Sequence, residues 1–122
     1  MPVNLKRIYD DAEEKDGYRV LVDGIWPRGM AKEDAKINEW LKEIAPSNDL
    51  RKWFGHDPDK WEDFKSKYKQ ELESGKQQEA LETLKQRTRE HNKNLTLLFG
   101  AKDEQHNQAQ VLKEIVDHQP GK

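Results

Sequence analysis

The sequence contains no cysteine, and this absence excludes several chemistries together. Without a thiol the chain forms no disulfide, no thiolate metal site and no cysteine nucleophile. It also lacks an apolar run near the roughly 18 residues that a membrane span needs, and its start shows no basic segment leading into an apolar one. We therefore expect oxygen and nitrogen chemistry in a cytoplasmic protein with no membrane partner.

Common cofactor and nucleophile motifs are missing as well. The chain has no G-x-G-x-x-G string, no Walker loop and no G-x-S-x-G string. Its histidines and carboxylates lack a diagnostic metal-ligand spacing such as H-E-x-x-H. We expect no nucleotide cofactor and no metal.

The chain has no excess of charge of one sign. Its 22 basic and 24 acidic residues give a formal net charge of −2, which provides no long-range attraction for nucleic acid or anionic lipid. The basic residues from Lys65 to Lys93 alternate with glutamates, as on a solvated helix face. This pattern disfavours nucleic-acid binding.

Charged residues are abundant and apolar ones are few. At 122 residues, of which 33% are hydrophobic and 38% charged, the chain fits one domain over residues 1–122 with a small core. Such a core depends on large side chains. We therefore expect the four tryptophans to be structural first: Trp26, Trp40, Trp53 and Trp61.

Short apolar runs predict the strands. Val20–Val22 and Leu95–Phe99 are continuous and β-favouring, as in strands that are covered on both faces. A mixed segment at residues 3–9 predicts another strand, separated from Val20–Val22 by an acidic stretch and a turn at Gly17.

Helical spacing and capping residues predict the other elements. Ser47 and Asp57 are expected N-caps, Pro58 suits a first helical position, and Gly55 and Gly75 are expected helix ends. The expected helices are residues 31–45, 48–54, 58–74, 77–92 and a last helix that follows Gly100–Asp103, with Asp103 as a candidate N-cap.

Strands separated by helices imply parallel pairing with right-handed crossovers. The expected fold class is therefore α/β, a small, mostly parallel sheet covered by helices in a single domain. The segments after Val22 and after Phe99 should emerge at the same edge of that sheet, which is where open parallel sheets bind ligands.

A first polar cluster follows Val22. Arg28, on a turn bounded by Gly29, suits a bidentate contact with a carboxylate or phosphate, with Asp23 holding it or acting as a base and Trp26 alongside. Alternatively, Asp23 and Arg28 form a structural ion pair that ties one loop.

A second polar cluster follows Phe99. Lys102 and the amides at the start of the next helix favour an anion there, with Asn107 close by, and His106 is a candidate general acid or base. Two structural alternatives remain open: Asp103 satisfies those amides as a helix cap, and His106 is an ordinary surface histidine.

A third candidate lies in the turn between two expected helices. His56 is placed to project outward beside Arg51 and Trp53, whereas Asp57 is better explained as a helix cap.

Three segments together carry a family resemblance. They are Arg19–Gly29, which ends in Trp-Pro-Arg-Gly, then Leu50–Pro58, which ends in Phe-Gly-His-Asp-Pro, and Leu97–Asp103. They closely resemble the YeaO-like branch of domain-of-unknown-function family 488. The resemblance implies a bacterial α/β protein and no defined activity. Wider members look to carry a Cys-His-Arg string near residues 105–107, where this chain has only His106, so a thiol-based mechanism lacks its thiol.

The leading functional hypothesis is a site for a small anionic molecule, binding or enzymatic, at the carboxyl ends of the strands. Arg28 and Lys102 would hold the anion, with Trp26, Gly29, Arg51 and Asn107 around it. If the site is catalytic, His106 or His56 moves protons and Asp23 orients a base or polarises water.

The competing hypothesis is a protein-interaction or regulatory module. Its surface would be an exposed aromatic patch of Trp26, Trp53 and Phe54. A ligand site predicts a concave pocket in which Arg28 and His106 converge, while an interaction module predicts exposed aromatic side chains on a flat face.

Overall fold

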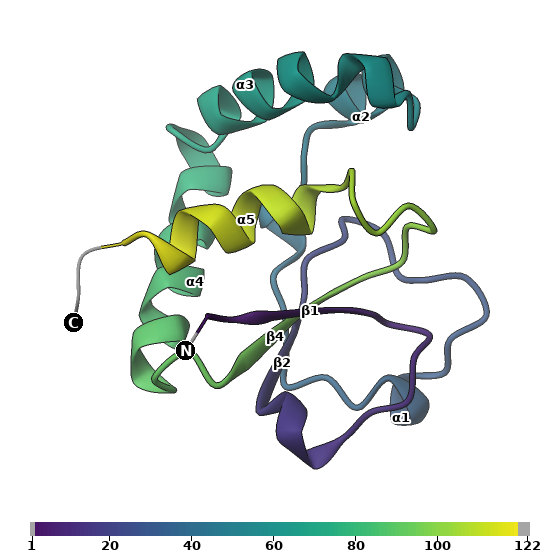
Figure 1. The fold of residues 1–122 in the computed structure, drawn as a ribbon, viewed down its shortest axis with the longest axis vertical. Coiled ribbons are helices and arrows are strands. Elements are labelled where there is room, and N and C mark those ends of the chain that lie inside the picture. Colours follow the sequence, from purple (N-terminus) through teal and green to yellow (C-terminus); the bar gives the residue numbers. More distant parts are fainter. Residues whose placement is uncertain (1, 120–122) are drawn as a thin grey trace.

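A four-stranded parallel sheet organises the protein (Figure 1). The computed structural model describes residues 2–119. Its strands are β1 (Asn4–Arg7), β2 (Tyr18–Leu21), β3 (Glu39–Trp40) and β4 (Leu95–Phe99), in the order β1-β4-β2-β3. The expected α/β class with a small parallel sheet is confirmed.

The two central strands are the apolar runs of the sequence. In β2 and β4, Val20 pairs with Leu97 and Leu21 with Leu98, and all four side chains are fully buried. Val20 and Leu97 pack in the larger core cluster, whereas Leu21 and Leu98 pack in a second cluster with Ile8 and Ala35. Both faces of the sheet are therefore covered, as a continuous apolar run requires.

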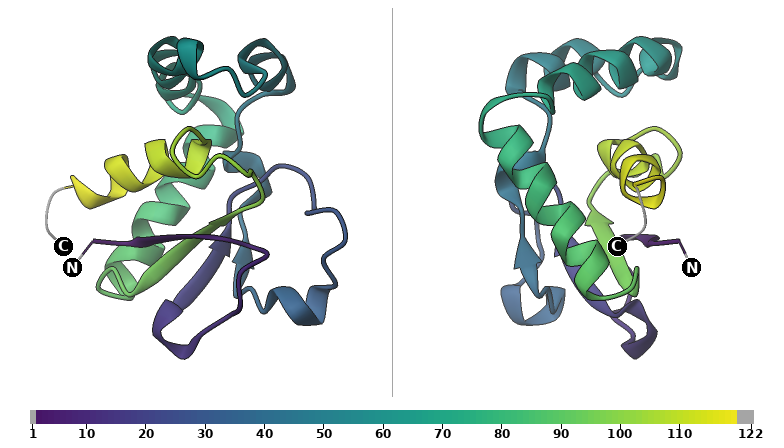
Figure 2. Two further views of the ribbon diagram at one scale, coloured as in Figure 1. Left: turned by 45° about the vertical axis from the view of Figure 1, so that its right-hand side comes forward. Right: turned by 90° about the vertical axis from the view of Figure 1, so that its left-hand side faces the viewer.

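Helices cover the two faces unequally. The larger core contains residues of α2 (Asn48–Phe54), α3 (Trp61–Glu71), α4 (Gly75–Glu90) and α5 (Gln108–Asp117). The other face carries only the short α1 (Lys32–Ala35) and its flanking loops. Figure 2 shows α5 between the sheet and α3, and Figure 1 shows α2 and α3 set apart at the top. Of the helices in residues 2–119, none is long and apolar enough to cross a membrane.

The predicted caps of α2 are confirmed. The Ser47 hydroxyl accepts a hydrogen bond from the Leu50 N–H at 3.1 Å, and Gly55 ends the helix in the left-handed region at φ 53°. Asp57 accepts from the Asp59 N–H at 3.0 Å and begins a single 3₁₀ turn that leads into α3. Gly75 starts α4 and does not end α3, which stops at Glu71.

The helix predicted over residues 31–45 is wrong. Only Lys32–Ala35 is α-helical, and Lys36 then turns left-handed at φ 48°. The chain continues as β3 because β2 needs a partner on its outer edge: the Leu41 N–H donates to the Leu21 carbonyl at 3.0 Å. Pairing with a neighbouring strand thus outweighs helical spacing, which extends over too few residues to stabilise a helix alone.

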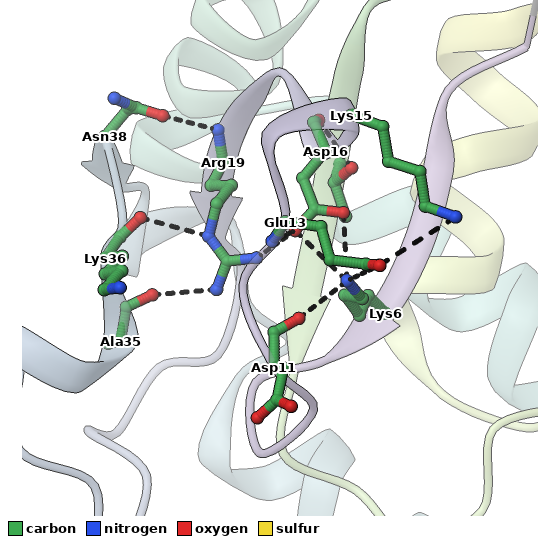
Figure 3. A network of polar contacts seen from close by, with 10 residues as sticks. Lys6, Asp11, Glu13, Lys15, Asp16, Arg19, Ala35, Lys36 and Asn38 are labelled. Carbon is green, nitrogen blue, oxygen red and sulfur yellow. Dashed lines mark hydrogen bonds and ion pairs between the residues drawn. The ribbon is translucent and has the colours of Figure 1, made fainter.

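A buried polar network connects strands across the sheet, from β1 to the segment before β3 (Figure 3). Arg19, 4% exposed, donates to Asp16 at 2.6 Å and to the carbonyls of Ala35 and Lys36 at 2.8 and 3.0 Å. Lys6 reaches the same Asp16 carboxylate from β1 at 3.0 Å. The network joins β1, β2 and the segment before β3, so these side chains are structural.

Candidate functional site

A cavity of about 300 Å³ lies at the carboxyl ends of β2 and β4, against α2 and α3. Its walls come from the loop after β2, the segment from Ala45 to His56, α3, and the loop between β4 and α5. The lining residues are Asp23, Gly24, Ile25, Ala45, Pro46, Asn48, Arg51, Phe54, His56, Phe64, Ala101, His106, Asn107 and Gln108. The expected meeting of the segments that follow Val22 and Phe99 therefore occurs, and it borders this cavity.

Asp23 is the acidic group of the cavity. One carboxylate oxygen accepts from the Gly100 N–H at 2.8 Å and the other from the Gln108 amide at 2.6 Å. Burial raises the pKa of Asp23, and the hydrogen bonds from Gly100 and Gln108 oppose that rise. Within residues 2–119 no Lys, Arg or His forms an ion pair with it. The predicted Asp23–Arg28 structural pair is therefore wrong.

His106 enters the cavity from the loop before α5. Its Nδ1 lies 2.9 Å from an Asp103 carboxylate oxygen, and its ring meets Trp61 edge-to-face with centroids 5.3 Å apart. The hydrogen bond from His106 lowers the pKa of Asp103, and the Gln105 N–H adds to this effect. The imidazole is thus held by a carboxylate on one side and an aromatic ring on the other.

The last helix begins later than predicted, at Gln108, and its N-cap is Asn107. The Asn107 side-chain oxygen accepts from the Ala109 N–H at 2.9 Å and the Gln110 N–H at 3.3 Å. Asp103 is therefore not the helix cap; it closes a turn by accepting from the Gln105 and His106 N–H groups. Asn107 is buried, so the cap also shapes the cavity wall.

Arg51 and His56 form the solvent-facing rim. Both side chains are exposed, and the only hydrogen bond of the Arg51 guanidinium within the described chain is to the Asn48 side-chain oxygen at 3.3 Å. His56 follows Gly55 in the left-handed region at φ 59°, which turns the chain from α2 towards α3. Its ring centroid lies 6.4 Å from that of Phe54.

The remaining wall is apolar. Phe54 and Phe64 stack with ring centroids 4.4 Å apart. Ile25 borders the same cavity and is 62% exposed. Phe64 and Gln108 also line the cavity, although the sequence analysis does not predict them as site residues. The signal that could have identified Gln108 is its position in the segment after the end of β4.

Four predicted site residues do not line this cavity: Trp26, Arg28, Gly29 and Lys102. Trp26 packs edge-to-face on Trp40, against the smaller core cluster. Arg28 is exposed and its backbone carbonyl accepts from the Tyr9 hydroxyl at 2.8 Å, while Gly29 provides a turn at φ 77°. The structure therefore does not bring Arg28 together with His106. Lys102 is exposed beside the lining residue Ala101.

The predicted aromatic patch is also wrong, because its members lie apart. Phe54 is 6% exposed in the larger core, and Trp26 packs on the other face of the sheet. Only Trp53 is exposed, at 37%, with the ammonium groups of Lys60 and Lys67 each 5.1 Å from its ring centroid.

The sheet and the cavity at its carboxyl edge define a small α/β protein with space for a small molecule. The chain belongs to the DUF488-N3i family, described as the inactive DUF488-N3 subclade, whose model matches residues 2–120. This result confirms the resemblance inferred from the sequence. No solved structure matches the chain.

Relatives from two bacterial groups support this assignment. The uncharacterized protein YeaO of Escherichia coli is 41% identical over 115 residues, 93% of this chain and 96% of YeaO. Uncharacterized proteins of Mycobacterium tuberculosis and Mycobacterium bovis are 46% identical over 70 residues, 57% of this chain. The match spans 59% of the length of each mycobacterial protein.

Proposed function

We propose that the protein binds a small organic anion in the cavity at the carboxyl ends of β2 and β4 and does not transform it. The observation that carries this proposal is the placement of Arg51 and His56 on the rim of that cavity. Open parallel sheets bind ligands at this edge. A volume of about 300 Å³ is at the lower end of the range for small-molecule sites.

Arg51 is the main anion-binding group in this proposal. A guanidinium offers five N–H donors, and Arg51 uses them little within the described chain, so a carboxylate or phosphate can accept two of them. His56 and His106 add ring N–H donors, and Lys102 adds positive charge beside Ala101. Arg51 thus takes the role that the sequence alone suggested for Arg28.

Three observations favour binding over turnover. Among the described residues that line the cavity there is no serine, threonine, cysteine, lysine or tyrosine to act as a nucleophile. Both oxygens of Asp23 already accept one hydrogen bond each, so neither is a free base in the unliganded protein. The description of the family as an inactive subclade points in the same direction.

A thermal-shift titration tests the proposal, because a ligand that binds only the folded protein must raise its Tm. The probes are 4-methylbenzoate and inorganic phosphate, on the wild type, Arg51→Gln and Arg28→Gln. We expect at least one probe to stabilise the wild type and Arg28→Gln, and to bind Arg51→Gln about tenfold more weakly, about 1.4 kcal/mol.

The two arginine variants form a matched pair, since both side chains are exposed and only Arg51 lines the cavity. Weakened binding by Arg28→Gln alone would move the anion site to the Trp-Pro-Arg-Gly turn. If neither probe raises the Tm of the wild type at any concentration, the proposal is wrong.

A further inference from the structure

The cavity has groups of opposite charge at two places. Asp23 lies where β2 and β4 end, contacting Gly100 and Gln108, whereas Arg51 lies on α2 with an exposed side chain. Both line the same cavity. They form no ion pair with each other, so each is available to a separate group of one ligand.

Asp23 presents an acceptor that the protein does not neutralise. Its two hydrogen bonds come from a backbone N–H and a side-chain amide, both uncharged. An ionised carboxylate has about four lone-pair sites, so about two remain for a ligand. An anionic group would be repelled here, whereas an ammonium group would donate to the carboxylate and offset the cost of its burial.

The surface between the two charges is apolar. The stacked rings of Phe54 and Phe64 form one part, and the exposed Ile25 forms another. A ligand that covers Ile25 gains the free energy of removing an aliphatic side chain from water. The middle of the ligand should therefore be hydrocarbon, either aromatic or aliphatic.

From these features we infer that the occupant is a zwitterionic amino-carboxylate, with its ammonium group on Asp23, its carboxylate on Arg51 and an apolar middle against Phe54, Phe64 and Ile25. This inference rests on the proposed function, and it adds the cationic end of the ligand. Asp23 is then the specificity-determining residue, because a simple organic anion leaves its carboxylate unpaired.

Three probes that share one ring test the inference by isothermal titration calorimetry. They are 4-(aminomethyl)benzoate, which has both charges, 4-methylbenzoate, which has only the carboxylate, and 4-methylbenzylamine, which has only the ammonium. On the wild-type protein we expect the zwitterion to bind at least about tenfold more tightly than either partner. This comparison does not depend on any variant folding.

Asp23→Asn and Arg51→Gln then separate the two ends. Asp23→Asn should remove the advantage of the zwitterion over 4-methylbenzoate while leaving the affinity for 4-methylbenzoate within about twofold. Arg51→Gln should weaken both carboxylates about tenfold and leave 4-methylbenzylamine unchanged. Circular dichroism melts confirm that each variant is folded under the titration conditions.

The outcomes distinguish this inference from the proposed function. If 4-methylbenzoate binds in an Arg51-dependent manner and the zwitterion binds no more tightly, the inference is wrong and the anion site stands. If Asp23→Asn weakens 4-methylbenzoate as much as the zwitterion, Asp23 acts through the cavity shape and the inference is also overturned. If neither carboxylate binds the wild type, the inference is wrong, and the proposed function then depends on the phosphate titration alone.

Discussion

Asp16 should be among the most costly single polar residues to neutralise in this protein. It is 4% exposed and accepts from Arg19 at 2.6 Å, from Lys6 at 3.0 Å and from the Glu13 N–H at 2.9 Å. Asp16→Asn keeps the shape but removes the charge, which leaves the buried Arg19 guanidinium without its counter-ion. Breaking a buried pair in this way costs about 3–5 kcal/mol.

For Asp16→Asn we expect a loss of stability near the lower end of that range of about 3–5 kcal/mol. Arg19 retains its hydrogen bonds to the carbonyls of Ala35 and Lys36, and an asparagine oxygen preserves one acceptor. A loss of about 3 kcal/mol corresponds to a fall in Tm of roughly 10 °C for a domain of this size. Chemical denaturation followed by circular dichroism measures the free energy of unfolding directly.

Glu13→Gln is the matched control, because Glu13 pairs with the same Lys6 at 2.8 Å but its side chain is half exposed. Solvent screens this pair, so its loss should change stability far less. In an Arg19→Gln background the Asp16→Asn change should cost less than in the wild type, since the unpaired charge is gone. Equal effects of Asp16→Asn and Glu13→Gln would refute the assignment of Asp16 as the buried centre of the network.

The pH dependence of Asp16 has a defined sign. Burial alone would raise the pKa of this carboxyl, but the Glu13 N–H, Lys6 and Arg19 together lower it below its usual 3.8. A lowered folded-state pKa contributes stability above the unfolded value that is lost as the pH falls through the folded one. The difference in stability between wild type and Asp16→Asn should therefore shrink in acid below pH 3.8.

Three further changes test other parts of the structure. In urea melts, Asp23→Asn should gain stability relative to the wild type as the pH rises from 3 to 7. The reason is that burial raises the pKa of Asp23, so the wild type loses stability as this carboxyl ionises. A difference in unfolding free energy that does not change with pH would contradict a raised pKa. Gly17→Ala should cost more than Gly75→Ala in the same melts, because both have positive φ but only at Gly17 would a Cβ collide with Asn94; equal costs would exclude that collision. Ser47→Ala should cost about 1 kcal/mol through loss of the α2 cap and of its bond to Glu71. Thr83→Ala serves as the control, because it also removes a hydroxyl but one that bonds only within α4, to the Glu79 carbonyl at 3.2 Å.

Local signals account for the parts of the fold that could be predicted. The apolar runs Val20–Val22 and Leu95–Phe99 predict β2 (Tyr18–Leu21) and β4 (Leu95–Phe99), because a continuous β-favouring run has few alternatives once both faces are covered. Ser47 and Asp57 act as caps through bonds to amides two or three residues away. Whether these two residues cap a helix therefore depends little on the rest of the chain.

The wrong prediction at β3 involves partners distant in the sequence. The β3 segment has helical spacing, but Leu21 and Arg19, about 20 residues earlier, supply the carbonyls that its amides need. Asp103 resembles a helix cap in sequence, yet Asn107 caps α5 because the chain makes a further turn first. Tertiary contacts therefore decide the first case, whereas in the second two local caps compete and the sequence pattern does not rank them.

Only part of the candidate site could be predicted from the sequence, because strand order shows which loops meet but not where each loop turns. Asp23 and His106 follow strand ends, and parallel topology brings such ends together, so their presence at one cavity follows from the fold class. Arg28 also follows a strand end but lies elsewhere, because its turn runs towards the face on which Trp26 packs. Position after a strand predicts the edge of the sheet and not the face to which a loop turns.

Asn107 fixes the start of α5 beside the cavity. Where the resemblance associates a Cys-His-Arg string with the wider family, this chain has Gln105, His106 and Asn107. His106 lines the cavity, while Asn107 accepts two amide hydrogen bonds to begin α5, which an arginine cannot do because its side chain has no acceptor. The asparagine therefore fixes the start of α5, and with it the place of Gln108 against Asp23. Two positions are therefore involved: Gln105 stands where the resemblance places a thiol, and Asn107 holds the hydrogen bonds that begin α5.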